Sequence, residues 1–350
     1  MLSCALIYSD RYLLPIGHHV FPSQKYSLVH DRLLSLGAAA PEDFLEPRAA
    51  ADEDVLLVHT PTYVHKLKTG TLSVREELEL EVPYSKPLIE AFWLMAGGSI
   101  LAADQALRDG VSVNIGGGFH HAFPDHGEGF CVVNDIAIAI RKMQRDGRIK
   151  RALTIDCDVH QGNGTAVIFG SHVETLPPDA WSASITAPSP AAQTMIEGGA
   201  GDVFTISLHQ LNNYPVWKPP SSIDINLPDG ITDREYLYWV EKALISARRL
   251  FEPELISYVA GADPYRYDQL GGLALTIEGL RQRDEMVLSF ARDWGVPVMV
   301  TLAGGYAEKL EDTVAIHTNT VLAANKVFAG VVSRRHTAPE MGIRHDKAAD

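Results

Sequence analysis

The stretch 156–164 reads Asp-Cys-Asp-Val-His-Gln-Gly-Asn-Gly and directly follows the apolar run Ala152–Ile155, which is typical of a buried strand. Asp156, Asp158 and His160 stand at alternate positions, and alternate residues of an extended chain point the same way. Carboxylate oxygens and an imidazole nitrogen suit a divalent ion such as zinc. The Gly-Asn-Gly that follows allows a sharp turn. A capped strand end with ordinary turn residues is the competing interpretation.

Three other apolar runs also end in residues that could carry chemistry. His120 and His121 follow the run Val111–Ile115 through three glycines, Asp263 follows Leu255–Ala260, and Tyr306 follows Val298–Leu302. The carboxyl ends of parallel strands meet at one edge of a sheet, where the ligand sites of such sheets lie. The sequence therefore predicts one site that collects side chains from four strands.

Strands that alternate with helices predict an α/β fold: a single-domain, three-layer α/β/α arrangement around a mainly parallel sheet. Residues 1–330 form the predicted catalytic domain. Predicted helices cover residues 32–36, 62–68, 87–108, 134–145, 233–250, 276–294 and 308–328, with Thr276 as an N-cap, and further strands cover 3–9 and 203–208. We expect a loop over 12–30, an inserted surface loop over Pro-rich residues 171–201, and a loose polar tail over 331–350.

Bulk composition excludes several classes of protein. The chain has 350 residues, is 46% hydrophobic and carries a formal net charge of −14, so it lacks the basic character of a nucleic-acid binder. Three cysteines without a CxxC pair indicate a reducing compartment, and we expect a cytoplasmic protein. No signal peptide and no membrane-spanning apolar stretch are evident.

The candidate residues are of the types found in metal-dependent active sites. Asp158, His160 and Asp263 make a three-ligand set that leaves room for water or substrate, as in catalytic metal sites. His120 and His121 can act as acid and base beside such a metal, and Asp156 can orient one of them. Tyr306 can donate to a developing oxyanion. Each residue also has an ordinary interpretation: a turn Asp before Pro264, a surface histidine pair, and an aromatic packed over glycines.

Five motifs in order resemble the histone deacetylase superfamily. They are Gly-Gly-Phe-His-His at 117–121, Gly-Glu-Gly-Phe-Cys-Val-Val-Asn-Asp at 127–135, the stretch at 156–164 quoted above, which we call the anchor, Gly-Ala-Asp-Pro at 261–264 and Gly-Gly-Tyr at 304–306. The form of the anchor, together with Asp-Gln-Leu-Gly-Gly at 268–272, looks most like the class IV branch and its bacterial relatives. The resemblance spans residues 4 to about 325.

The resemblance implies an arginase-like fold and a zinc-dependent amidohydrolase of N-acyl-lysine or a related acylated amine. It implies Asp158, His160 and Asp263 as metal ligands, with zinc or ferrous iron as the ion. His121 would be the general base and acid, and His120 would pair with Asp156. Tyr306 would polarise the substrate carbonyl.

The resemblance also implies a substrate tunnel and a second ion. Gly129 and Phe130 match one tunnel wall, and Tyr214 matches the opposite wall. A structural potassium site would use backbone carbonyls of Asp156, Asp158 and His160 with Ser207 and Leu208. Two residues depart from common patterns: Asn163 stands where some members have an Asp beside the tandem histidines, and Tyr267 stands where class IV relatives usually have a glycine and would narrow the entrance.

Several functions stay open at this point. The candidate substrates are acylated protein lysine, acetylpolyamine and small acylated metabolites. We expect no direct nucleic-acid or membrane partner. An arginase-type ureohydrolase with two metals is a second enzyme class, but Asn163 and Tyr265 stand where its extra carboxylates would be needed. A catalytically silent acyl-lysine binding module is the third. Acyl chain length and oligomeric state do not follow from the sequence.

Overall fold

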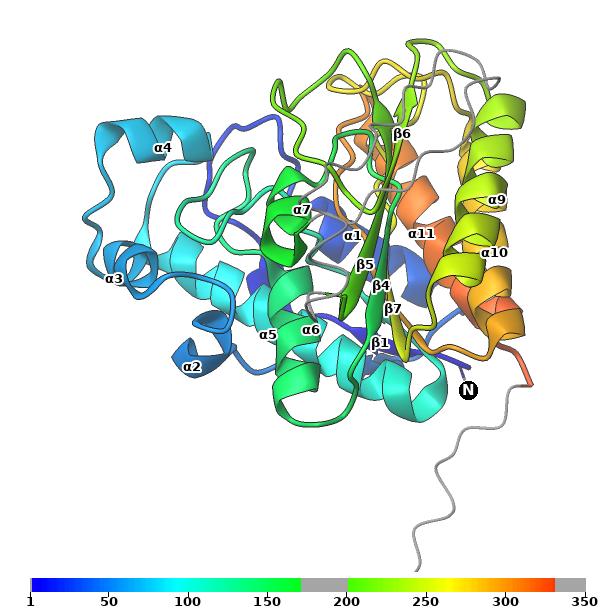
Figure 1. Ribbon diagram of the computed structural model, residues 1–350, viewed down its shortest axis with the longest axis horizontal. Coiled ribbons are helices and arrows are strands. Elements are labelled where there is room, and N and C mark those ends of the chain that lie inside the picture. The colour runs from blue at the N-terminus through cyan, green and yellow to red at the C-terminus, as the bar shows by residue number, and fades with distance from the viewer. Residues whose placement is uncertain (1, 171–200, 331–350) are drawn as a thin grey trace, which may run out of the picture.

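One parallel sheet organises the molecule, in a computed structural model that describes residues 2–170 and 201–330. Eight strands lie in the order β2-β1-β3-β8-β7-β4-β5-β6, and every pair is parallel (Figure 1). The strands are β1 Ala5–Ile7, β2 Phe44–Leu45, β3 Val111–Asn114, β4 Ala152–Asp156, β5 Val203–Gln210, β6 Ile223–Leu227, β7 Leu255–Val259 and β8 Val298–Thr301. The predicted parallel sheet is confirmed.

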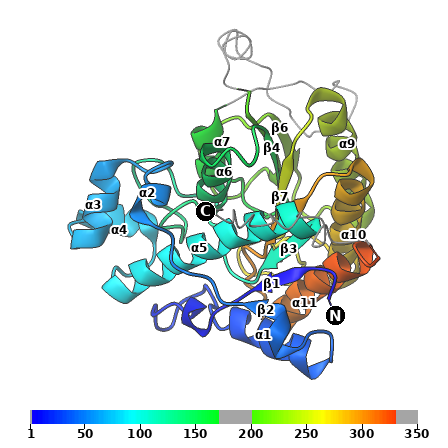
Figure 2. The ribbon, with the colours of Figure 1, turned by 90° about the horizontal axis from the view of Figure 1, so that it is seen from below.

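Helices cover both faces of this sheet, which confirms the three-layer α/β/α prediction. In Figures 1 and 2, α1, α9, α10 and α11 lie on one face, while α5, α6 and α7 lie on the other. The helices are α1 Lys25–Ser35, α2 Asp52–Val55, α3 Pro61–Thr69, α4 Val74–Leu80, α5 Lys86–Asp109, α6 Asp135–Arg145, α7 Asn163–Phe169, α9 Asp233–Leu250, α10 Ile277–Trp294 and α11 Leu310–Val327, with short 3₁₀ turns at Asp10–Tyr12 and Pro41–Asp43. None of the helices in the described ranges is long and apolar enough to cross a membrane.

The core lies on both sides of the sheet because side chains alternate along each strand. Tyr258 and Val300 belong to the cluster under one helical layer, whereas Val259 and Met299 belong to the cluster under the other. All four are essentially inaccessible to solvent. Strands buried on both faces read as largely apolar runs, which is why β4, β7 and β8 were predictable.

Helix ends follow the expected capping chemistry. The Thr276 hydroxyl accepts from Gly279 N–H at 2.9 Å, as the predicted N-cap of α10 requires. Helix α5 begins after Ser85, whose side chain accepts from Leu88 N–H, and ends at Gly110 with φ +90°. Helix α9 has the bounds predicted from its amphipathic pattern.

The structure corrects one predicted loop and adds several short elements that were not predicted. The predicted loop over 12–30 is wrong beyond residue 24, because α1 begins at Lys25 and buries Tyr26, Val29 and Leu33 at helical spacing. Five short elements were not predicted: α2, α4, α7, β2 and β6. Strand β6 alternates apolar and polar residues in a short segment. The predicted loop over 171–201 lies outside the described residues except for Gly201, and the predicted tail over 331–350 lies wholly outside them.

Candidate active site

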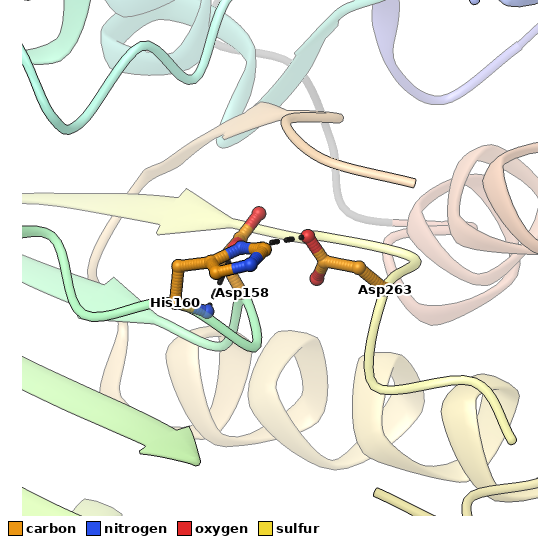
Figure 3. Close-up of side chains that lie close together, drawn as sticks. All are labelled: Asp158, His160 and Asp263. Carbon is orange, nitrogen blue, oxygen red and sulfur yellow. Dashed lines mark hydrogen bonds and ion pairs between the residues drawn. The ribbon is translucent and has the colours of Figure 1, made fainter. Parts of the chain in front are cut away.

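Asp158, His160 and Asp263 come together at the carboxyl ends of β4 and β7 (Figure 3). His160 Nδ1 lies 3.1 Å from Asp158 Oδ1 and 3.4 Å from Asp263 Oδ2. All three side chains are buried, and one potential ligand atom from each lies within 4.8 Å of the others. The short spacing in the anchor and the adjacent position of β7 in the sheet bring these side chains to one point.

This group fits a divalent metal ion. Asp263 Oδ2 is buried and makes no hydrogen bond, with only the His160 imidazole beside it at 3.4 Å, a costly state for a carboxylate oxygen unless a cation binds there. A Cβ on Gly304 would overlap that oxygen and lie 2.6 Å from Asp158 Oδ2, so the glycine leaves room beside the carboxylates. Burial and the neighbouring Asp158 raise the pKa of Asp263 to about 7, which is the expected cost of crowding acidic groups around a cation site.

His120 forms a buried pair with Asp156. Its Nδ1 lies 2.7 Å from Asp156 Oδ2, and its Nε2 lies 3.8 Å from Asp158 Oδ1. Burial opposes a positive charge on His120, but the carboxylates of Asp156 and Asp158 outweigh it and raise the pKa of His120 to about 9. The structure therefore brings together the pair that the sequence predicted.

His121 has a neutral partner instead. Its Nδ1 lies 2.8 Å from Asn163 Oδ1, and both residues are buried. Burial, followed by the neighbouring His120 and His160, lowers the pKa of His121 well below its usual value. A neutral imidazole in this position has a lone pair available to accept a proton.

Tyr306 stands on a loop that is held from two sides. The Asp268 carboxylate accepts from Tyr306 N–H at 2.7 Å, and the buried Lys25 ammonium donates to the Ala303 carbonyl at 2.6 Å. Ala303 has φ +54°, an uncommon conformation for a residue with a side chain. Burial, followed by the charges of Asp158 and Asp263, raises the pKa of Tyr306 well above its usual value, so the phenol keeps its proton.

Two adjoining cavities, which have five lining residues in common, form a passage to these residues. Its outer part has a volume of about 170 Å³ and its inner part about 20 Å³. Gly129, Phe130 and Tyr214 line the outer part, as predicted, and Glu81 and Leu270 also line it. Gly129 and Phe130 have φ +53° and +68°, and this turn aims the Phe130 ring toward Tyr306, with 6.0 Å between ring centroids.

Two sets of predicted residues have a different status. Tyr267 does not line this passage; it is 55% exposed and packs edge-to-face on Tyr265. At the predicted potassium site, Ser207 pairs in register with Asp156, and its hydroxyl lies 2.9 Å from His209 Nδ1. Leu208 is buried beside it. Potassium binding there stays a prediction.

Sequence reasoning missed three residues of this site: Lys25, Glu128 and Asp268. Asp268 and Glu128 lie within quoted motifs, so their position was a signal that could have been followed. Lys25 lay in the segment predicted to be a loop, where only its full burial in the folded chain marks it out.

Comparison with known proteins agrees with this geometry. Residues 19–321 match the family described as histone deacetylase domain. The chain is 36% identical over 324 residues to an uncharacterized protein of Picosynechococcus sp., covering 92% of this chain and 99% of that protein. It is 31% identical to histone deacetylase 2 of Arabidopsis thaliana and 30% identical to the acetoin utilization protein AcuC of Bacillus subtilis. These matches cover 89% and 87% of this chain, and 76% and 78% of the relatives.

Solved structures share the fold. The crystal structure of an HDAC homolog from Aquifex aeolicus superposes with a TM-score of 0.72 at 22% identity, covering 93% of this chain and 88% of that one. An HDAC homolog complexed with SAHA also gives a TM-score of 0.72, at 23% identity, with coverage of 93% and 84%. The chain belongs to the histone deacetylase family and is a hydrolase of that family.

Proposed function

We propose that this protein removes an acyl group from the amine of N-acyl-lysine, or of a related acylated amine, with a divalent metal at Asp158, His160 and Asp263. One observation supports the proposal above the others. Asp158 and His160 of the buried metal-ligand group, the tandem histidines and Tyr306 all line the inner end of one passage, and Asp263 lies directly beside Asp158 and His160. An acylated amine on a thin aliphatic chain fits such a passage, whereas a bulky substrate does not.

The metal would supply two effects when bound: it lowers the pKa of a water molecule and polarises the amide carbonyl. His121 would accept the proton of the attacking water through Nε2, because its Nδ1 side is already occupied by Asn163. His120, paired with Asp156, would stay positively charged and stabilise negative charge that develops at the carbonyl oxygen.

Tyr306 would donate its phenolic hydrogen to that oxygen, which gains negative charge as the amide carbon becomes tetrahedral. A histidinium, formed when His121 takes the proton from water, would then protonate the leaving amine. The base and the acid would thus be one side chain used twice, and no further titratable group would be needed.

Competing functions make different demands. A two-metal ureohydrolase needs a second ligand group, and the described residues bring only the Asp158–His160–Asp263 set together. An acetylpolyamine would use the same residues, and the Glu81 carboxylate at the mouth would suit its additional positive charge. A silent binding module would have no need of Tyr306 or of both histidines.

The test is turnover of acyl-lysine peptides from acetyl to myristoyl, and of acetylated polyamines, by zinc-loaded and by ferrous-loaded protein. We expect cleavage that a chelator abolishes and that added metal restores. The best substrate would set the acyl length and the amine class. Binding of the whole series without cleavage would favour the silent module, and urea release from a guanidine would favour a ureohydrolase.

A further inference from the structure

A partly buried carboxylate ends a hydrogen-bond chain that begins at His121. His121 Nδ1 lies 2.8 Å from Asn163 Oδ1, and Asn163 Nδ2 donates to Glu128 Oε1 at 2.6 Å. The Tyr214 hydroxyl donates to the same Glu128 oxygen at 2.7 Å. A single carboxylate oxygen therefore contacts both the partner of the catalytic histidine and one wall of the substrate passage.

The chain has a fixed direction. Gly164 N–H donates to Asn163 Oδ1 at 3.0 Å, so this end of the amide must be the oxygen. The ionised Glu128 can only accept, so the other end must be the amino group. With both ends of Asn163 determined, the hydrogen between the two side chains must sit on His121 Nδ1, which leaves the Nε2 lone pair free.

Glu128 is ionised at neutral pH. Burial opposes its ionisation, but the nearby His126 imidazole and the hydrogen bonds from Tyr214 and Asn163 outweigh burial and lower the pKa of Glu128. His126 Nε2 lies 3.6 Å from its second oxygen, and the Glu128 side chain is 20% exposed. The carboxylate is thus a stable acceptor held among several donors.

Glu128 also supplies the charge that Asn163 lacks. His120 contacts the Asp156 carboxylate directly, whereas His121 reaches a carboxylate only through the Asn163 amide. Hydrogen bonds in a chain polarise one another, so the carboxylate makes the Asn163 oxygen a better acceptor. Loss of an outer hydrogen-bond partner of a metal-ligating histidine lowers activity by about 10–100-fold, and we expect an effect of this order for a histidine beside the metal.

We infer that Glu128 is a positioning residue for the acyl-amine hydrolysis site, where it orients Asn163, and through it His121, while holding Tyr214 against the same passage. The inference rests on the proposed function for the role of His121 in turnover. The hydrogen-bond chain itself is independent of any substrate, which allows the two to be tested apart.

A double-mutant cycle tests the chain. Asn163→Asp places a carboxylate against Glu128, and the repulsion should lower both kcat/KM, by about 10–100-fold, and the melting temperature. Glu128→Gln removes the charge and should lower kcat/KM by about 10-fold. In the double variant the new Gln amide can donate to the new Asp and to the Tyr214 oxygen, so kcat/KM and the melting temperature should recover to near the wild-type values.

A purely structural role for Glu128 predicts the opposite result. The losses in kcat/KM and in melting temperature from the two substitutions would then add. A double variant with lower values than either single variant would overturn the inference. Glu79→Gln is the matched control. Glu79 lines the same surface groove as Glu128, its carboxylate accepts from Arg75, and its loss should leave kcat/KM unchanged for an acyl-lysine peptide without flanking charges.

A spectroscopic measurement removes the dependence on turnover. In zinc-loaded protein labelled with ¹⁵N-histidine, the His121 Nδ1–H proton should resonate downfield, move upfield in Glu128→Gln, and return downfield in the double variant. An unchanged resonance in Glu128→Gln would contradict the inference even if the enzyme is active. A shifted resonance in a protein that cleaves no acylated amine would keep the chain and reject the proposed function.

Discussion

At the scale of single residues, Tyr306 carries the clearest prediction. Its phenol is buried, keeps its proton and lies beside His160, with 6.4 Å between ring centroids. Tyr306→Phe removes one oxyanion donor and little volume, so kcat should fall by about 10²–10³-fold, or roughly 3–4 kcal/mol in the barrier. Metal content and the melting temperature should stay near wild type. Near-normal turnover by a folded, metal-loaded Tyr306→Phe protein would remove Tyr306 from the mechanism.

A substitution at Gly304 tests the proposed metal ligands without changing those residues themselves. The added methyl of Gly304→Ala would overlap Asp263 Oδ2 and approach Asp158 Oδ2 to 2.6 Å, so it must displace ligand oxygens. We expect metal stoichiometry, measured by elemental analysis after dialysis, to fall well below one per chain while circular dichroism stays native. Gly201→Ala is the control, because a Cβ there meets nothing within 4 Å. Full metal content in Gly304→Ala would show that this group does not bind the ion.

At the scale of elements, helix α5 packs so closely on the backbone of residues 48–50 that one methyl group added at Gly97 would shift the helix. A Cβ on Gly97 would overlap the Arg48 carbonyl and lie 2.9 Å from Ala50 N, both of them backbone atoms that cannot rotate away. Alanine favours an isolated helix over glycine by about 1 kcal/mol, yet Gly97→Ala should lower the free energy of unfolding by about 1–3 kcal/mol. Urea titration measures this. The exposed Glu90→Ala on the same helix should stay within about 0.5 kcal/mol of wild type.

Helix α10 is fixed to the strand ends beneath the site by a fully buried arginine. The Arg283 guanidinium donates to the carbonyls of Gly261 at 2.7 Å and Cys157 at 3.2 Å, and it pairs with Asp284 at 2.9 Å. Breaking a buried pair from one side leaves the other charge uncompensated, so Arg283→Met should cost about 3–5 kcal/mol of unfolding free energy. Arg281→Met, which loses only surface ion pairs, should cost less than about 1 kcal/mol. Equal urea midpoints for the two variants would contradict this role.

How far the sequence predicts these elements depends on whether the signal is local. The central strands were predictable because burial on both faces leaves a continuous apolar run, and α9 because its apolar stripe has the helical period. Only the last turn of helix α1 was predicted, as a helix over 32–36, because the buried residues of its earlier turns are interleaved with polar ones after a loop-like segment. The short alternating strand β6 had no run to mark it.

The same distinction holds for the site. Asp158 and His160 stand two positions apart in the sequence. Asp263, His121 and Tyr306 were predicted because each follows the carboxyl end of a predicted strand. The position of Glu128 beside Asn163 is a contact between residues 35 apart, and Lys25 reaches Ala303 across 278 residues. The left-handed conformation of Phe130 is likewise imposed by its surroundings, since its own side chain disfavours it.

At the scale of the whole molecule, charge bears on substrate choice. The chain carries a formal net charge of −14, and the mouth of the passage carries the Glu81 carboxylate. The groove beside it is lined by Asp125 and Glu79, among other residues. A negative field over a narrow entrance attracts positively charged substrates and speeds their encounter with the site. The proposed acyl-amine substrates should therefore be bound best when cationic groups flank the acylated amine.

Ionic strength separates this long-range attraction from local contacts. For an acyl-lysine peptide with flanking lysines or arginines, kcat/KM should fall about 3–10-fold between about 20 mM and 500 mM salt, because the Debye length shortens from roughly 20 Å to a few ångströms. A neutral peptide with the same acyl-lysine should change little, and Glu81→Gln should flatten the salt dependence of the cationic peptide. Equal salt dependence for both peptides would mean that the overall charge of the protein does not affect substrate binding. The acyl group and the shape of the passage alone would then select the substrate.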